Sequence, residues 1–380
     1  MEYYLSAVRR KTLDKKSSQL REIIMRRKYL DNIRWITVLL VVVYHVIFMF
    51  NGVTTYGVIG PFNDFQPQDV YQYIVYPWFM FLLFVVSGMS ARYELDAKGE
   101  EGFIRKRTRK YLVPSTIGLF IFGWVLGYYN MLISGAFEQM GAVPKPVLFL
   151  IMAVSGTGPL WYIQMLWVFS LLLMPIRKIE KDKLYNLCEK TNIIILFLLV
   201  FVIYGSAQIM NTPIIVVYRF GIYGIGFLLG YFMFSHDKVM ELLEKYWLIF
   251  TAIAVATCII FVILKWGESY PDHEVLDTFI CNAYTWFGTL GVLSFMKKWG
   301  GFSNTLSQWM NAKSWGIYVF HYLPIAVCAW YLRNLVPNMP PFIVYILVAI
   351  SGFAGSIILY EVISRIPVIR WCVLGIKNKA

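Results

Sequence analysis

The stretch that decides the fold is Tyr29-Leu-Asp-Asn-Ile-Arg-Trp-Ile-Thr-Val-Leu-Leu-Val-Val-Val-Tyr-His45, an apolar run that carries Arg34 and His45. At about 100° per residue, a helix returns His45 to within about 20° of Arg34, so the two share one face. The rise between them is about 16 Å, half of a bilayer core. An ionisable group at that depth is costly, so His45 is a candidate functional residue. The alternative is a core histidine hydrogen-bonded to a neighbouring helix.

The composition of the chain places it in a membrane. Of its 380 residues, 58% are hydrophobic, 18% are aromatic and only 15% are charged, which excludes an ordinary soluble domain. Apolar runs of about 20 residues recur, and they predict an all-α polytopic integral membrane protein with about ten transmembrane helices in one bundle. The apolar run 147–154 is too short to span. The expected spans are 33–52, 73–90, 111–134, 157–176, 192–210, 214–235, 246–265, 275–296, 314–335 and 342–364.

The positive charges predict the orientation of these spans. Lys and Arg alternate between rich and poor loops with a split of 31 to 3, and Arg219 is left inside a span. This bias predicts cytoplasmic termini in a multi-pass protein of the cell membrane, the plasma membrane of a bacterium. The expected parts are a basic cytoplasmic segment at 1–32, a transmembrane domain at 33–364 and a short cytoplasmic tail at 365–380. The net charge of +13 records topology and contact with the lipid bilayer rather than nucleic-acid binding.

Motifs for cofactors and metals are missing from the sequence. The five cysteines form no CxxC pair and the four histidines lie far apart, so we expect no disulfide framework, no metal site and no bound cofactor. The chain has no P-loop and no nucleophile elbow. Two GxxxG patterns, at 123–127 and 226–230, favour close helix packing within the monomer, with a homodimer face as the alternative.

Four further side chains could join His45. His321 lies in the inner half of the ninth expected span, and Arg219 lies near the outer side of the sixth. Arg219 could equally snorkel to the interface. Trp161 and Tyr162 open the fourth expected span, where an aromatic belt also explains them.

The inner ends of the spans carry a second group of candidates. Ser87 and Gly88 end the second expected span, and the block Arg105–Lys110 holds five positive charges in six residues. Such a block either fixes topology or holds a phosphorylated ligand. Glu361 and Arg365 lie one helical turn apart in the last span, a spacing that favours a structural ion pair.

These residues resemble the membrane acyltransferase 3 family along nearly the whole chain. Arg34 and His45 match its signature Arg-x10-His in the first span. Phe84-Val-Val-Ser-Gly88 and Arg107-Thr-Arg-Lys-Tyr-Leu-Val-Pro114 match its second motif, an apolar stretch with Ser-Gly followed by Arg-x-x-Arg-x-x-x-Pro.

The chain departs from the family pattern at two places. Lys110 replaces the usual second arginine, which keeps a point charge but loses bidentate phosphate binding. Pro159-Leu-Trp-Tyr162 stands where members often carry His-Leu-Trp-Phe, so any role of that histidine is absent.

The resemblance implies transfer of an acyl group, acetyl or succinyl, from cytoplasmic acyl-CoA as co-substrate to a hydroxyl of an extracytoplasmic glycan or lipid-linked acceptor. Neutral His45 would be the general base, reached from both sides through a polar tunnel. The alternatives are relay through a transient acyl group on a protein or lipid, and a proton-coupled transporter that uses the same side chains. The expected roles are catalytic for His45 and Arg34, donor-binding for Arg107, Lys110, Arg105 and Ser87, acceptor or tunnel for Arg219, Trp161, Tyr162 and His321, and structural for Glu361 and Arg365.

Overall fold

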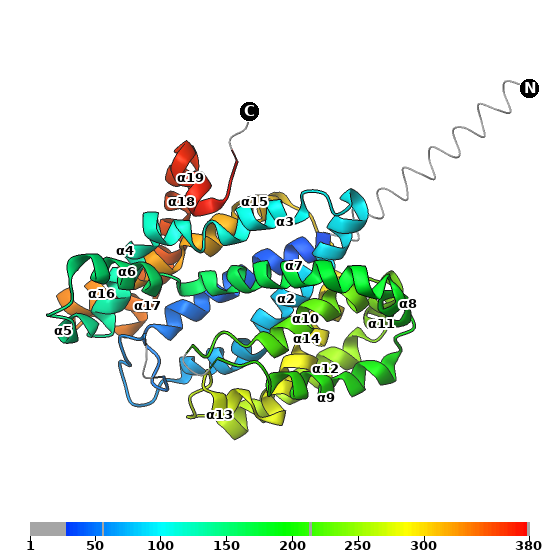
Figure 1. Cartoon of the computed structure of the whole chain (residues 1–380). Helices are drawn as coiled ribbons and strands as arrows, with labels where there is room; N and C mark the ends of the chain where they lie inside the picture. Colours follow the sequence, from blue (N-terminus) through cyan, green and yellow to red (C-terminus); the bar gives the residue numbers. More distant parts are fainter. Residues whose placement is uncertain (1–27, 55–56, 213–214, 378–380) are drawn as a thin grey trace, which may run out of the picture.

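The computed structural model describes residues 28–54, 57–212 and 215–377, and these residues fold into helices with no β-strand among them (Figure 1). Most of the expected N-terminal segment 1–32 lies outside the described residues. The first described helix is Lys28–Phe48. The next elements are η1 Pro67–Asp69, α2 Val70–Lys98, α3 Phe103–Arg107, η2 Thr108–Leu112, η3 Leu119–Gly123, α4 Trp124–Ile133, α5 Ala136–Gln139, α6 Lys145–Ser155, η4 Gly158–Leu160 and α7 Trp161–Glu180.

The second half of the chain continues the helical pattern. Its elements are α8 Lys183–Cys188, α9 Ile193–Ala207, α10 Phe220–Leu229, η5 Gly230–Phe234, α11 Asp237–Lys245, α12 Trp247–Lys265, α13 His273–Leu276, α14 Phe279–Trp299, α15 Thr305–Phe320, α16 Tyr322–Leu335, α17 Pro341–Ile350, η6 Ser351–Gly355, α18 Ser356–Arg365 and α19 Pro367–Leu374. The segments η2, η3, η5 and η6 are π-helical turns.

The helices confirm an all-α polytopic membrane fold. Among the described residues, six are long and apolar enough to cross a bilayer, or seven when α15 and α16, which meet at a 55° bend, count as one span. Four shorter apolar helices occupy Leu119–Ile133, Lys145–Ser155, Ile193–Ala207 and Phe220–Phe234. Three of these fall within expected spans, and Lys145–Ser155 contains the run 147–154. The count of ten spans therefore stays a prediction.

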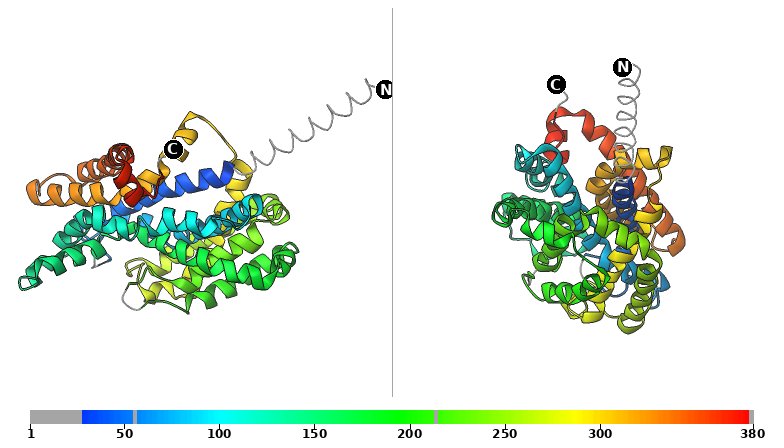
Figure 2. Two further views of the ribbon diagram at one scale, coloured as in Figure 1. Left: turned by 45° about the horizontal axis from the view of Figure 1, so that its top comes forward. Right: turned by 90° about the vertical axis from the view of Figure 1, so that its right-hand side faces the viewer.

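Helix α2 forms the centre of the bundle. Most of its side chains are buried, and it packs against α10, η5, α14, α12 and α7. Figures 1 and 2 show the long helices lying side by side around it. Because Gly230 has no side chain, its backbone lies directly against the Val85 carbonyl, and Gly127 lies in the same way against the Met152 carbonyl. Both GxxxG patterns thus serve packing within the chain, as predicted.

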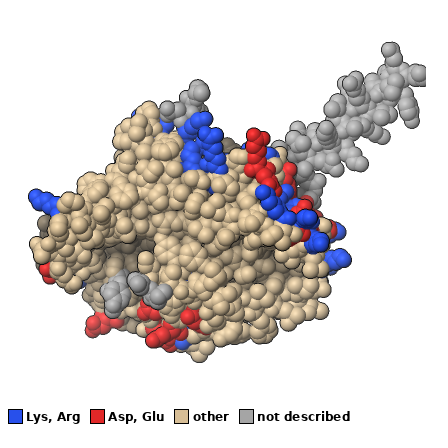
Figure 3. All heavy atoms as spheres, in the orientation of Figure 1, with Lys and Arg blue, Asp and Glu red and all other residues tan. Residues whose placement is uncertain are grey.

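The outer surface of the bundle is apolar over a broad area. In the space-filling view of Figure 3, uncharged side chains cover most of the face shown, and charged residues gather toward its margins. Large apolar side chains are exposed on the helices outside α2, for example Ile263 on α12 and Phe342 on α17. Such a surface belongs in contact with lipid tails, since water would penalise it.

The bend between α15 and α16 brings a buried histidine to the middle of the bundle. His321 is the junction residue, and Pro324 follows one turn later. Proline has no N–H to donate to the carbonyl four residues earlier, which explains why the helix changes direction here.

Candidate functional site

One face of the first helix lines two separate cavities. Residues 31, 34 and 38 line the first, and residues 41, 45 and 48 line the second, a spacing of alternating three and four residues that marks a single helical stripe. The prediction that Arg34 and His45 share a face is therefore confirmed. We call the two spaces the basic cavity and the histidine cavity.

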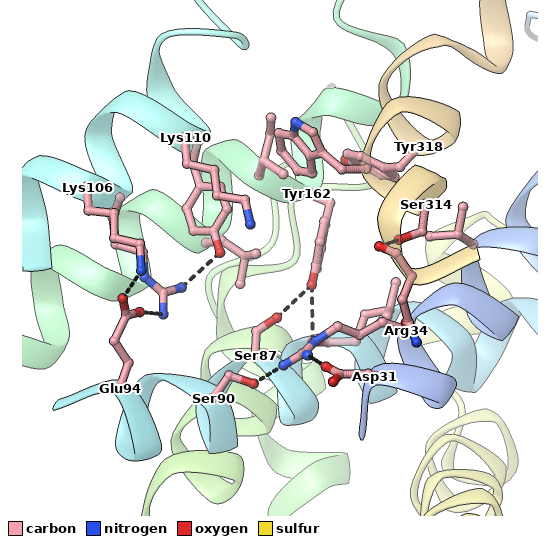
Figure 4. Close-up of a pocket in the computed structure, with 18 residues that line it drawn as sticks. Asp31, Arg34, Ser87, Ser90, Glu94, Lys106, Lys110, Tyr162, Ser314 and Tyr318 are labelled. Carbon is pink, nitrogen blue, oxygen red and sulfur yellow. Dashed lines mark hydrogen bonds and ion pairs between the residues drawn. The ribbon is translucent and has the colours of Figure 1, made fainter. Parts of the chain in front are cut away.

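The basic cavity, of about 490 Å³, is rich in charge. Four cationic side chains and two carboxylates line it, from the first helix, α2, α3 and η2: Arg34, Lys106, Arg107, Lys110, Asp31 and Glu94. The excess of cations makes the cavity electropositive. In Figure 4, Lys106 and Lys110 lie on one side and Arg34 lies on the other, with Tyr162 between them.

The carboxylates hold some of these cations more firmly than others. Glu94 pairs with Lys106 and, at 3.0 Å, with Arg107, whose guanidinium also donates to the Tyr111 hydroxyl at 2.9 Å. An incoming anion would have to compete with Glu94 for Arg107. Lys110 has no carboxylate within ion-pair distance among the described residues, and its ammonium lies 5.1 Å from the centre of the Trp315 ring. Lys110 is thus the cation best placed to meet a ligand.

Arg34 and Ser87 also line the basic cavity. The Arg34 guanidinium pairs with Asp31 and donates to the Ser90 hydroxyl, which orients it toward the cavity (Figure 4). The Ser87 hydroxyl lies 2.8 Å from the Tyr162 hydroxyl, which also donates to the Leu83 carbonyl. This places Tyr162 in the basic cavity rather than in an interfacial aromatic belt.

The histidine cavity, of about 410 Å³, is mainly aromatic. His45 is partly exposed in it, and eight aromatic side chains line the same space: Tyr44, Phe48, Tyr76, Phe79, Trp161, Tyr223, Tyr318 and Tyr322. Thr54, Ser269 and Asp272, from the loops at its mouth, add hydroxyl and carboxylate groups. The cavity therefore offers stacking surfaces, hydrogen-bonding groups and one imidazole.

A thin wall separates the two cavities. Tyr318 lines both, and its hydroxyl donates to the Pro159 carbonyl across the boundary. On the first helix, the linings change between positions 38 and 41, and on α2 they change between 83 and 80. Both changes span one helical turn, about 5 Å of rise. The two cavities are separate spaces that share Tyr318 in their linings, and the open polar tunnel predicted from the sequence stays a prediction.

Three predicted site residues lie elsewhere than expected. Arg105 is exposed and does not line the basic cavity, because its neighbours on α3 turn inward instead. Arg219 is buried outside both cavities, where its guanidinium pairs with Asp277 at 3.0 Å and meets the Leu276 carbonyl. His321 is fully buried and lines neither cavity, but its Nε2 lies 3.1 Å from His45 Nδ1. Arg219 and His321 thus line neither of the two cavities.

Glu361, near the end of the last expected span, forms its closest ion pair with a residue other than the expected Arg365. Glu361 lies 3.7 Å from Arg365, which is largely exposed, and it also pairs closely with Lys313 on α15. The contact with Lys313 joins α18 to α15, so it is the one that ties two helices together.

Sequence reasoning missed Glu94, Lys106 and Tyr318. A signal for Tyr318 was present, since it lies three residues before His321 on one helix face. For Glu94 and Lys106, twelve residues apart across a turn, no periodicity in the sequence indicates the contact.

Comparison with known protein families gives one match. A model of the acyltransferase domain of the acyltransferase 3 family matches residues 27–361. No curated protein and no solved structure matches the chain. Within the family, the segments at 87–92, 318–321 and 359–367 resemble glucans biosynthesis protein C, a closer likeness that stays a prediction. With the match covering most of its length, the chain belongs to the acyltransferase 3 family.

Proposed function

We propose that this membrane acyltransferase moves an acyl group from acyl-CoA, bound at the basic cavity, to a hydroxyl of a glycan or lipid-linked acceptor in the histidine cavity. The observation that carries the proposal is the division of one helix face between an electropositive cavity at Arg34 and an aromatic cavity at His45, with Tyr318 lining both. The two substrates then approach from opposite ends and react at the boundary.

The basic cavity suits the donor because CoA carries several phosphate charges on a long, flexible thiol arm. Lys110 and Lys106 at its mouth attract phosphates, with Lys110 free of carboxylate competition among the described residues. The inner lining passes Val38, Leu83 and Tyr162 toward Tyr318. A thioester at the end of the arm would follow this path toward His45.

The histidine cavity suits a hydroxylated acceptor. Sugar rings stack on aromatic faces and form hydrogen bonds at their edges, and the cavity offers both, with Ser269 and Asp272 near its mouth. The acyl group of the donor is acetyl or succinyl, and the activity assay includes both donors.

The chemistry assigned to His45 is general base catalysis. His45 takes the proton of the acceptor hydroxyl as its oxygen attacks the thioester carbonyl. The C–S bond breaks, the new O-acyl bond forms, and the proton passes from His45 to the departing thiolate to give free CoA thiol. This direct transfer needs Tyr318 to move aside, whereas a relay would place the acyl group on a third group first.

A reconstituted system tests the activity. The purified protein in liposomes receives acetyl-CoA or succinyl-CoA together with a glycan acceptor, and free thiol and acylated glycan are measured. Thiol release that depends on acceptor, with one acylated hydroxyl per thiol, supports the proposal. A proton-coupled transporter would release no thiol, and the absence of thiol release with every donor and acceptor would overturn the proposal.

The orientation of the cavities is part of the proposal. The charge bias of the loops supports cytoplasmic termini, a basic cavity on the cytoplasmic side of a bacterial plasma membrane, and a histidine cavity on the outer side. In a variant without native cysteines, Asp272→Cys should react with an impermeant thiol reagent in intact cells, and Lys178→Cys should react only after lysis. The reverse labelling pattern would exchange the sides of the donor and the acceptor.

A further inference from the structure

His45, which is partly exposed, and His321, which is fully buried, form a directed hydrogen-bonded pair. His321 follows α15 at its bend, and its ring stands beside His45 with 5.0 Å between the ring centroids. In a neutral imidazole, one ring nitrogen donates a hydrogen and the other accepts one, and the neighbours decide which.

The neighbours of His321 determine which of its two ring nitrogens carries the hydrogen. Its Nδ1 lies 2.9 Å from the Tyr318 carbonyl and 3.1 Å from the Ile317 carbonyl. A carbonyl oxygen only accepts, so Nδ1 of neutral His321 carries the hydrogen. Its Nε2 is then a bare acceptor.

The Nε2 acceptor of His321 in turn determines which ring nitrogen of His45 carries the hydrogen. The Nδ1 of His45 lies 3.1 Å from His321 Nε2 and 2.9 Å from the Val41 carbonyl. Both neighbours are acceptors, so Nδ1 of neutral His45 is protonated and shares its hydrogen between them. No described residue hydrogen-bonds to His45 Nε2, and the side chain lines the histidine cavity.

We propose that His321 is a positioning residue that holds His45 as the Nδ1–H tautomer, so that its Nε2 is the basic nitrogen presented to the acceptor hydroxyl. This inference rests on the proposed role of His45 as general base. It gives His321 the orienting role that a carboxylate fills in other base–orienter pairs, with a neutral acceptor suited to an apolar site.

The hydrogen bonds from His45 Nδ1 also stabilise His45 when it becomes protonated during the reaction. When His45 Nε2 takes the hydroxyl proton, the ring becomes positive and its Nδ1–H bonds to Val41 and His321 strengthen, because hydrogen bonds from an ionised donor are stronger. The proton cannot pass further through His321, since its other nitrogen already donates to carbonyls. The proton therefore stays within the His45–His321 pair until His45 returns it to the thiolate.

Two amide variants separate this role from simple packing. His321→Gln places an amide oxygen near the former Nε2 and keeps an acceptor for His45. His321→Asn is shorter, so its amide reaches only the region of Nδ1 and leaves His45 without that acceptor. Loss of one hydrogen bond to a charged group predicts that the Asn variant loses about 10- to 100-fold in kcat with little change in KM for acyl-CoA. The Gln variant should retain most of the wild-type kcat.

The tautomer itself is measured without activity. The chain has four histidines, so ring-nitrogen labelling with ¹⁵N gives four imidazoles to assign by solid-state NMR at a pH where they are neutral. The expected spectrum places hydrogen on Nδ1 of both His45 and His321, and His321→Asn increases the fraction of His45 with hydrogen on Nε2. Hydrogen on Nε2 of wild-type His45 would overturn the inference.

The two measurements distinguish this inference from the proposed function. If NMR finds the expected tautomers but the protein transfers no acyl group, the proposed function is wrong and the tautomer assignment stands. Acyl transfer that is equally fast in the Asn and Gln variants would remove the role of His321 and keep the proposed function.

Discussion

The basic cavity and the histidine cavity lie along one helix face but differ in how their polar side chains are held. In the basic cavity, charge is plentiful and most cations have a partner, since Glu94 pairs with both Lys106 and Arg107, and Asp31 pairs with Arg34. In the histidine cavity, a single imidazole is held by uncharged neighbours, the Val41 carbonyl and His321. The first arrangement tolerates the loss of one charge, whereas the second depends on one nitrogen. We therefore expect mutations to have unequal effects in the two cavities.

The largest effect is expected at His45. His45→Ala should lower kcat for acyl transfer by about 10²- to 10⁴-fold, because it removes the only described imidazole that lines either cavity. Acylated glycan formed by protein in liposomes measures the change. His273→Ala, at the first residue of α13 and outside both cavities, is the matched control and should stay near the wild-type rate. Wild-type turnover in His45→Ala would show that the histidine cavity holds no catalytic base.

A smaller effect is expected at Lys110 in the basic cavity. Lys110→Gln should raise KM for acyl-CoA about three- to tenfold and leave kcat almost unchanged, since an exposed charge contributes modestly to phosphate binding. Added salt should weaken donor binding less in the variant than in the wild type. Lys98→Gln, an exposed lysine at the end of α2, is the control. A fall in kcat with an unchanged KM would place Lys110 outside the donor site.

The wall between the cavities predicts a third effect. Tyr318→Phe removes the hydrogen bond to the Pro159 carbonyl and keeps the ring in place. Loss of one such bond, about 1 kcal/mol, predicts that acyl-CoA hydrolysis without acceptor rises about fivefold, because water then reaches the thioester more often. Tyr322→Phe removes a hydroxyl from a side chain that lines the histidine cavity but not the basic cavity, and it should leave this hydrolysis unchanged. Equal hydrolysis in the wild type and Tyr318→Phe would mean that this hydroxyl does not close the wall.

The smallest effect is expected at Arg105. Arg105→Gln should change KM for acyl-CoA less than about twofold, since the side chain is exposed and outside the basic cavity. Lys106→Gln, the next residue on α3, should raise KM more. If Arg105→Gln has the larger effect, the donor extends over the outer surface of α3 instead of entering the cavity.

The sequence predicted the class of fold and the shared face of Arg34 and His45, because helical periodicity and hydropathy are local properties. It predicted a cluster of cations near 105–110 but not which of them turn inward. The π-helical turn η2, Thr108–Leu112, shifts the face on which Lys110 lies relative to the cations of α3. Glu94 is supplied by another helix, and no local pattern indicates such a contact.

The placement of Arg219 and His321 could not be predicted for a related reason. Each is a buried polar group in an apolar segment, and the sequence alone suggests a functional residue for both. The residues that each side chain contacts decide whether it lies near His45. Asp277 and backbone carbonyls hold Arg219 in a loop contact, whereas the bend at Pro324 brings His321 to His45. Both partners are distant in sequence and become neighbours only through the packing of the bundle.

The thin wall at Tyr318 also has an electrical consequence. If polar cavities enter the membrane from both sides, most of the membrane potential falls across the one helical turn that separates them, and a charge that passes the wall experiences nearly the full voltage. The cost or gain is about 2.3 kcal/mol per unit charge at 100 mV. A neutral acetyl group is indifferent to this field. A succinyl group carries a carboxylate, and a potential that is negative inside would drive it outward, so the voltage dependence of turnover would distinguish a charged cargo from a neutral one.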